Sequence, residues 1–242
     1  LDISSKTRDA AQMMMSKTKT VPASQAVGPK WDVTRKAEFQ HLLDHRSFDC
    51  LKKHDVIREK NVRSMRDLNV MHMIWVFTIK PDGRDKARLC VQGSADKDKG
   101  NILSASPTLT RESFRMILFI LAQMHWECWS GDVPQAFLKA DEEFWDREIY
   151  CVPPPMMGFA PDDILKLRKC VYGLIDAPLQ WWATVNDWME QNGLERSMFD
   201  PSVFVLRNNA NGIEGIVGVA VDDTLWGGSD NMKAKMEDFA KR

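Results

Sequence analysis

Three aspartates stand where strand-forming residues surround them. In "VGVAVDDTLWGG", residues 217–228, an apolar run leads directly into Asp222 and Asp223 and then resumes. Aspartate is depleted in strands, and an unpaired carboxylate is costly to take out of water. Asp132 in "WSGDVPQAFLKA" has similar apolar neighbours. Carboxylates are hard oxygen donors suited to Mg²⁺, so a strand-end Asp with a hairpin Asp pair outlines a two-metal phosphoryl-transfer site.

Each aspartate also has an ordinary structural explanation. An Asp pair is common in solvated turns, and Asp132 suits the N-cap of a helix. Adjacent residues of a straight strand point to opposite faces, so Asp222 and Asp223 share a site only at a hairpin turn. No Gly, Asn or Pro stands beside the pair, and its flanks are apolar, which favours the metal-binding interpretation.

The first element expected to support such a site is a helix in "WDVTRKAEFQHLLDH", residues 31–45. Asp32 or Thr34 is its candidate N-cap. Its apolar face is expected to contain Val33, Ala37, and either Leu42 or Leu43.

The rest of the chain mixes strands and helices without strict alternation, which favours an α+β fold. The expected elements are a hairpin around residues 81–83, a helix from Thr110, strands within 127–133, 147–152, 202–207 and 213–221, a helix from Pro134, a helix capped by Asp176 and stopped at Gly193, and a helix from Ser229.

Composition excludes some classes of protein. The net charge of −1 counts against a generic nucleic-acid binder, although a local basic patch would suffice. Five cysteines without a CxxC pair predict buried free thiols in a reducing compartment. With no membrane span and no signal-peptide pattern, the expected location is intracellular, cytoplasmic or nuclear, and not secreted. The missing initiator methionine suggests a piece of a longer chain.

Several ordered motifs accompany the aspartates. They are "IWVFTIKPDGRDKARLCVQG", "LSASPTLTRESFRMIL", "DVPQAFLKA", "EIYCVPPPMMGF", "KLRKCVYGLIDAPLQWW" and "VAVDDTLWGG". In this order and spacing they resemble the reverse transcriptase of copia-type retrotransposons, from Trp31 to about Gly228. The resemblance implies a right-hand polymerase: an antiparallel palm sheet backed by helices, a fingers-like region, and a missing thumb. Residues 1–29 would be a disordered lead-in or linker, 30–125 the fingers-like region, and 126–242 the palm.

The resemblance also implies roles for the three aspartates. Asp132, Asp222 and Asp223 would be catalytic and hold two Mg²⁺ ions, or Mn²⁺ in their place. The metals would activate the primer 3′-OH, align it with the α-phosphate of a dNTP and neutralise the leaving pyrophosphate.

Basic residues on the hairpin are candidates for substrate binding. Lys80, Lys86 and Arg88 would contact the triphosphate or the template backbone. The alternative is a solvated hairpin, because Asp82 and Asp85 partly cancel their charge.

Two further residues are candidates for substrate binding, and each has a structural alternative. Phe137 matches the bulky residue that excludes a 2′-OH, or it belongs to the core. Asp176 stands where the family usually has Gln near the nucleotide, and it also serves as an N-cap. Ala220 departs from the family's usual Tyr.

The resulting functional hypothesis is an RNA-directed DNA polymerase domain of a retrotransposon. Its partners would be dNTPs, an RNA or DNA template with a primer, and other segments of a longer polyprotein. One alternative is a truncated or decayed, catalytically silent remnant that at most binds nucleic acid. Another is a two-metal nuclease, which the polymerase motifs disfavour.

Overall fold

The chain folds as two units, each built from two separate stretches of the sequence. In the computed structural model, which describes residues 18–154 and 157–241, the first unit comprises the chain up to Gly100 together with Arg147–Leu174. The second comprises Asn101–Asp146 and the chain from Ile175. The mixed α+β class is confirmed. The division between units differs from the boundary expected at 125/126, because strands after residue 147 pair with strands of the first unit.

The first unit is built around a six-stranded sheet of order β1-β3-β6-β7-β2, with β4 paired to β3. Strand β6 runs parallel to β3, and the other pairings are antiparallel. Its elements are β1 (Lys19–Val21), α2 (Pro29–Asp44), β2 (Phe48–Lys52), α3 (Lys53–Glu59), β3 (Val70–Ile79), β4 (Asp85–Val91), β6 (Tyr150–Val152) and β7 (Asp163–Leu167).

Part of the lead-in expected at residues 1–29 lies outside the described residues. Within the rest of it, β1 pairs with β3 over Lys19–Val21, and Ala26 is buried in a small cluster with Trp31 and Phe77. The residues just before α2 therefore belong to the packed structure of the first unit.

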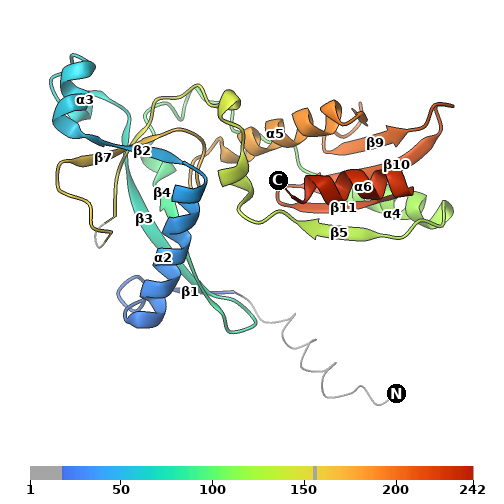
Figure 1. Ribbon diagram of the computed structural model, residues 1–242, viewed down its shortest axis with the longest axis horizontal. Coiled ribbons are helices and arrows are strands. Elements are labelled where there is room, and N and C mark those ends of the chain that lie inside the picture. Colours follow the sequence, from blue (N-terminus) through green and yellow to red (C-terminus); the bar gives the residue numbers. More distant parts are fainter. Residues whose placement is uncertain (1–17, 155–156, 242) are drawn as a thin grey trace. The chain divides into compact units, whose positions relative to one another are not determined.

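Helix α2 lies along the β3–β4 hairpin, and of the residues expected on its buried face only Leu42 is buried (Figure 1). The helix begins at Pro29, so neither Asp32 nor Thr34 caps it. Val33 is 69% exposed and Leu43 is 44% exposed. The buried residues are instead Trp31, Arg35, Glu38 and Leu42.

Two charged residues are tolerated on the buried face of α2 because backbone groups satisfy them. Arg35 donates to the carbonyl oxygen of Ala26, and Glu38 accepts a hydrogen bond of 3.4 Å from the backbone N–H of Leu89. Burial raises the pKa of Glu38 despite that bond. The expected apolar stripe failed because it assumed that only apolar residues face the sheet.

The backbone of the first unit approaches itself closely at two glycines, in the segments "VQG" and "YGL". Gly173 has φ +96°, and a Cβ there would stand 2.1 Å from the carbonyl oxygen of Val91. A Cβ on Gly93 would stand 2.2 Å from the carbonyl oxygen of Gly173. The backbones approach because the N–H of Val91 donates to Tyr172 O at 2.7 Å. Only glycine fits at this crossing.

We expect Gly173→Ala to lower the free energy of unfolding by about 3 kcal/mol or more, since it adds a backbone clash to an unfavourable φ. Gly83→Ala is the matched control, because Gly83 has φ +82° and a Cβ added there would meet nothing within 4 Å. It should cost only about 1 kcal/mol. Urea denaturation measures both, and equal losses would show that the crossing is not tightly packed.

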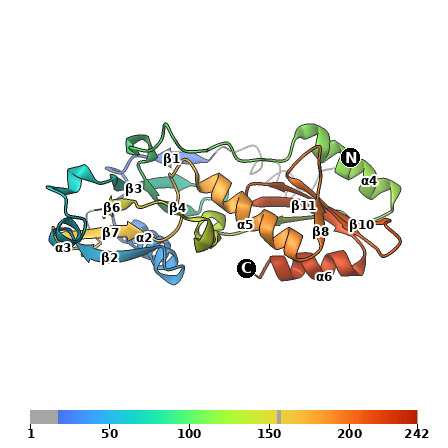
Figure 2. The ribbon, with the colours of Figure 1, turned by 90° about the horizontal axis from the view of Figure 1, so that it is seen from above.

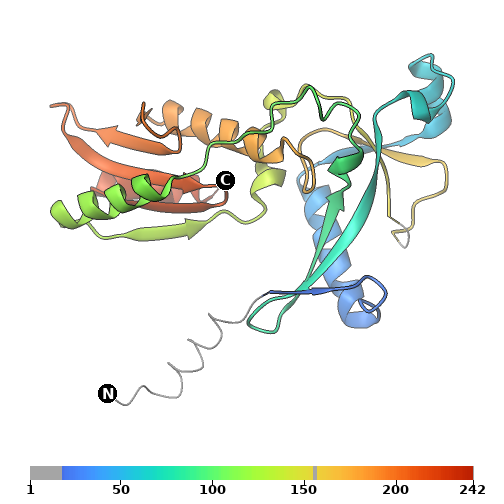
Figure 3. The same ribbon diagram turned by 180° about the vertical axis from the view of Figure 1, so that it is seen from behind.

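The second unit is a five-stranded antiparallel sheet of order β5-β11-β10-β9-β8, with helices on both faces. Figure 2 shows α4 on one side of the sheet and α6 on the other. The helices and strands of the unit are α4 (Arg111–Gln123, green in Figure 3), β5 (Trp129–Asp132), α5 (Ala177–Gln191), β8 (Leu194–Arg196), β9 (Val203–Arg207), β10 (Ile213–Ala220), β11 (Asp223–Gly228) and α6 (Asp230–Phe239). The helix expected from Pro134 is only a 3₁₀ turn, Ala136–Lys139.

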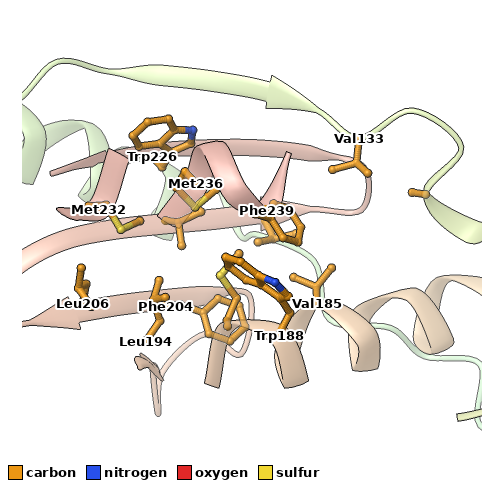
Figure 4. Packing of buried hydrophobic residues seen from close by; sticks show 14 of the residues in the cluster. Val133, Val185, Trp188, Leu194, Phe204, Leu206, Trp226, Met232, Met236 and Phe239 are labelled. Carbon is orange, nitrogen blue, oxygen red and sulfur yellow. The ribbon is translucent and has the colours of Figure 1, made fainter. Parts of the chain in front are cut away.

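Alternation along β10 supplies a core on each face of this sheet. Val217 and Val219 pack with α5 and α6 in the larger cluster, which includes the residues in Figure 4. Ile216 packs on the other face with Ile117 and Leu121 of α4. Two-sided coverage makes the central strands apolar and leaves the aspartates at the strand ends as the polar exceptions.

Two expectations drawn from composition have different outcomes. All five cysteines are free, but Cys50 and Cys128 are exposed, so the prediction that they are buried was wrong for these two. Among the described residues, no helix is both long and apolar enough to span a membrane.

Candidate active site

The carboxylates stand at a tight and strained hairpin turn. Ala220 and Asp223 pair across β10 and β11, so Val221 and Asp222 form the two-residue connection. Val221 has φ +60°, a conformation that β-branched residues rarely adopt and that typically costs about 1–3 kcal/mol. The indole Nε1 of Trp181 donates to the carbonyl oxygen of Val221 at 2.7 Å. This bond from buried α5 helps to hold the turn in place.

The third aspartate meets this turn across the sheet. Asp132 ends β5 and is the direct register partner of Asp223 on β11. One residue further, the N–H of Val133 donates to Asp222 O at 2.8 Å. Directly opposed residues project to the same face with Cβ atoms about 4.5–5.5 Å apart. The predicted convergence of aspartates ninety positions apart is therefore confirmed at the level of the backbone, and Asp132 caps no helix.

The electrostatics of the three carboxylates are unbalanced. All three residues are exposed, and across residues 18–154 and 157–241 no side-chain hydrogen bond or ion pair involves Asp132, Asp222 or Asp223. Partial burial raises the pKa of Asp223, and the negative charges of Asp222 and Asp132 raise it further. The second unit therefore places like charges together without a basic neighbour to neutralise them.

The donor set at this turn suits a divalent cation, although the side chains do not enclose one. In the part of the chain that the structure describes, no group of three or more His, Cys, Asp or Glu is close enough to hold a metal ion. Like charges repel and turn exposed carboxylates apart. The strand register, not the side-chain rotamers, sets which residues face one another. Hard oxygen donors on adjoining strand ends fit Mg²⁺, which needs only one or two protein carboxylates.

A pocket of about 390 Å³ opens beside Asp132 and Asp223 on the face of the sheet that α4 covers. Ala220 lines it next to the carboxylates. Its other lining residues are Leu109, Phe114, Ser130, Gly131, Gly218, Thr224 and Leu225. The carboxylates thus border a largely apolar hollow rather than open sheet.

Two other candidate residues of the second unit lie in different settings. Phe137 is half-buried and packs against the α5–α6 core, and it does not line the pocket. Asp176 immediately precedes α5, as predicted, but it is 1% exposed and makes no side-chain cap hydrogen bond. The position of Phe137 supports its assignment to the core, whereas Asp176 occupies the N-cap position without making the cap hydrogen bond.

The candidate basic residues belong to the first unit. Lys86 and Arg88 share one face of the β3–β4 hairpin, with Arg88 5.4 Å from the ring centre of Tyr172. Asp85 is paired with Lys30 of α2 at 3.1 Å. Because strand faces alternate, Asp85 lies on the face opposite Lys86, so it does not cancel that charge directly.

The tip of this hairpin contains the remaining candidate, Lys80. Its backbone N–H donates to Arg84 O, and the side chain of Arg84 pairs with Asp82. Asp82 is therefore occupied by its neighbour in the turn. Asp82 and Asp85 were expected to offset the positive charge of this hairpin, and each forms an ion pair with a specific basic residue.

Sequence reasoning missed the interactions that support the turn carrying Asp222 and Asp223. Val221 reads as an ordinary strand residue, and Trp181 in "LQWW" reads as an ordinary core residue. The signal was the shortness of the "AVDDT" connection, because a two-residue hairpin needs positive φ at its first position and no glycine is present.

A comparison with known protein families now identifies the chain. Residues 59–242 match the family model described as reverse transcriptase (RNA-dependent DNA polymerase). The chain belongs to this family. The match includes all three aspartates and the whole β10–β11 hairpin. The resemblance to copia-type reverse transcriptases is confirmed.

Curated relatives match this chain over a small part of their own length. The Retrovirus-related Pol polyprotein from transposon RE2 of Arabidopsis thaliana is 33% identical over 171 residues, covering 66% of this chain and 11% of the relative. The one from transposon TNT 1-94 of Nicotiana tabacum is 36% identical, covering 64% and 12%. The Transposon Ty1-BL Gag-Pol polyprotein of Saccharomyces cerevisiae is 28% identical, covering 65% and 8%. The chain spans about a tenth of the length of these relatives.

Within this reverse transcriptase chain, Trp181→Phe should lower the free energy of unfolding by about 2–4 kcal/mol, since it removes both indole volume and the bond to Val221. Trp188→Phe is the matched control, because Trp188 is also buried and packs on Phe239 without bonding to the turn. Denaturant titration gives both values. A loss no larger than in the control would mean that the hydrogen bond does not hold the turn.

We expect Asp223→Asn to stabilise the reverse transcriptase chain at neutral pH. A carboxyl with a raised pKa in the fold favours folding most while it is protonated, and that contribution is lost as pH rises through its folded pKa. The stability difference between variant and wild type should therefore vanish under strongly acidic conditions. Thermal melts across pH measure it, with the exposed Glu127→Gln as control. A variant less stable than wild type at neutral pH would contradict the charge repulsion.

Proposed function

We propose that this chain is the RNA-directed DNA polymerase domain of a retrotransposon polyprotein, adding dNTPs to a primer on an RNA or DNA template by two-metal nucleotidyl transfer. The observation that carries the proposal is the register of the second unit, in which Asp132 stands directly opposite Asp223 and beside Asp222. Family membership supports it, since reverse transcriptases generally use divalent metals.

In this proposal Asp132, Asp222 and Asp223 hold two Mg²⁺ ions. Such metals lower the pKa of the attacking hydroxyl and stabilise the leaving oxygen. The protein's own contribution is geometric. Trp181 holds the Val221 carbonyl, and β5 presents Asp132 in register, so the carboxylates stand together before any cation arrives.

We assign the second unit to the palm and the first unit to the fingers, and neither is assigned to a thumb. Lys86 and Arg88 share one face of the β3–β4 hairpin, and Asp85 lies on the opposite face in an ion pair with Lys30, which supports a role of the two basic residues in binding phosphates. Lys80 joins them at the hairpin tip. Phe137 would exclude the ribose 2′-OH only by moving from the core packing that it now has.

A catalytically silent remnant is the second candidate, and two residues favour it. Ala220 offers no aromatic surface beside Asp223, and Asp176 puts a buried carboxyl where the family usually has Gln. Both changes weaken contacts with substrate while leaving the metal ligands intact. This candidate retains the fold and the carboxylates but extends no primer.

Primer extension with an RNA template, dNTPs and Mg²⁺ distinguishes the two candidates. If the chain polymerises, Asp132→Asn and Asp222→Asn should each reduce extension by more than about a hundredfold, since an amide is a poor Mg²⁺ ligand. Mn²⁺ binding by calorimetry should weaken in parallel, and Glu127→Gln should change neither. Extension near the wild-type rate in either Asn variant, with an unchanged circular dichroism spectrum, would refute the assignment. No extension by wild type, with intact Mn²⁺ binding, would identify the remnant.

A further inference from the structure

The pocket beside the carboxylates has walls of two different kinds. Leu109, Phe114 and Leu225 form apolar walls, and Phe114 on α4 is an aromatic side chain that is 42% exposed. Asp132 and Asp223 form an acidic wall. The volume of about 390 Å³ is within the range of pockets that hold small organic molecules. An apolar pocket with negative charge at one side suits a ligand that has an apolar part and a positive charge at one end.

The strand register brings these walls together on one face of the sheet. Ser130 lies opposite Leu225, and Asp132 lies opposite Asp223, so both pairs project to the side that α4 covers. On the neighbouring strand Ala220 lies opposite Asp223. A methyl group there fills little space, so the hollow extends up to the carboxylates.

The floor of the pocket is packed more tightly than its acidic side. A Cβ on Gly218 would stand 2.6 Å from Ile117 and 2.8 Å from Leu109. The side chains of Leu109 and Ile117 therefore already cover the strand at that position. The pocket therefore has an apolar base at Leu109 and Gly218 and a charged edge at Asp132 and Asp223.

The charged edge lacks a cation of its own. Among residues 18–154 and 157–241, no lysine or arginine forms an ion pair with Asp132 or Asp223. The ammonium group of Lys233 lies over the ring of Trp129 on β5, 5.1 Å from its centre. Trp129 alternates with Ser130 and so projects to the opposite face. A cationic group entering the pocket would meet carboxylates without competing with a protein cation.

We propose that this pocket binds planar aromatic cations, with the ring against Phe114, Ala220 and Leu225 and the positive group at Asp132 and Asp223. The ring buries apolar surface and gains an aromatic neighbour in Phe114. An amidinium is suitable, because it is planar and its N–H groups match a carboxylate in geometry. The ligand class goes beyond the proposed polymerase, and its binding requires neither nucleic acid nor polymerisation.

The direct test compares benzamidine with benzamide, a neutral molecule of nearly the same shape. NMR titration of the wild-type chain should show benzamidine binding about fivefold more tightly, the gain expected for an exposed ion pair. Shifts should be largest at residues lining the pocket. In the Asp223→Asn variant the ratio of the affinities for benzamidine and benzamide should fall toward one. Equal affinity of the two compounds for the wild-type chain, or an unchanged preference in the variant, would overturn the charged half of the proposal.

A pair of variants on one helix tests the apolar half. Phe114→Ala should weaken the binding of both compounds severalfold, since it removes the aromatic wall. Phe119→Ala is the matched control, because Phe119 is also on α4, is 64% exposed and does not line the pocket. Both positions are exposed, so both variants should fold. Equal effects of the two substitutions, or unchanged binding in Phe114→Ala, would show that the ring binds elsewhere.

Discussion

The candidate site depends on a two-residue turn whose first residue is in an unfavourable conformation. Val221 has positive φ without being glycine, and such strain persists only where the surroundings determine the backbone strongly. Here the surroundings are ladder pairs on both sides of β11 and an indole bond from α5. The large core beneath the sheet therefore has a specific role. It fixes the position of the Val221 carbonyl oxygen, and with it the backbone of Asp222 and Asp223, which come next in the chain.

That arrangement opposes stability at the place where it serves the proposed chemistry. The strained residue is followed directly by two like charges, and a third stands across the ladder. Each feature raises the free energy of the folded chain, and the apolar clusters on both faces of the sheet offset the cost. A sequence free to minimise its energy would place glycine and neutral residues here. The concentration of unfavourable features at one turn is itself an argument for function.

The sequence predicted the existence and type of most elements, and it predicted that Asp132 and Asp222 would meet. Apolar runs and turn formers indicated the hairpins, and the motif order indicated the pairing of distant strands. It failed where backbone groups outside the helix satisfy polar side chains, as at Arg35 and Glu38 of α2, because the periodicity of the helix does not reveal such partners. It failed again at residues 147–174, whose short strands pair according to tertiary contacts rather than sequence neighbourhood.

The interleaving of the two units has a consequence for the order in which the chain can fold. Strand β2 pairs with β7, and Lys52 bonds to Asp163 across 111 positions. During synthesis, β2 has no partner until β7 has left the ribosome, by which time α4 and β5 of the second unit have already emerged. The first unit can therefore complete its sheet only after part of the second unit has been synthesised, and the second unit is completed later still. The nascent chain therefore carries an unpaired strand edge while the residues between β2 and β7 are made, and such an edge can pair wrongly with another chain.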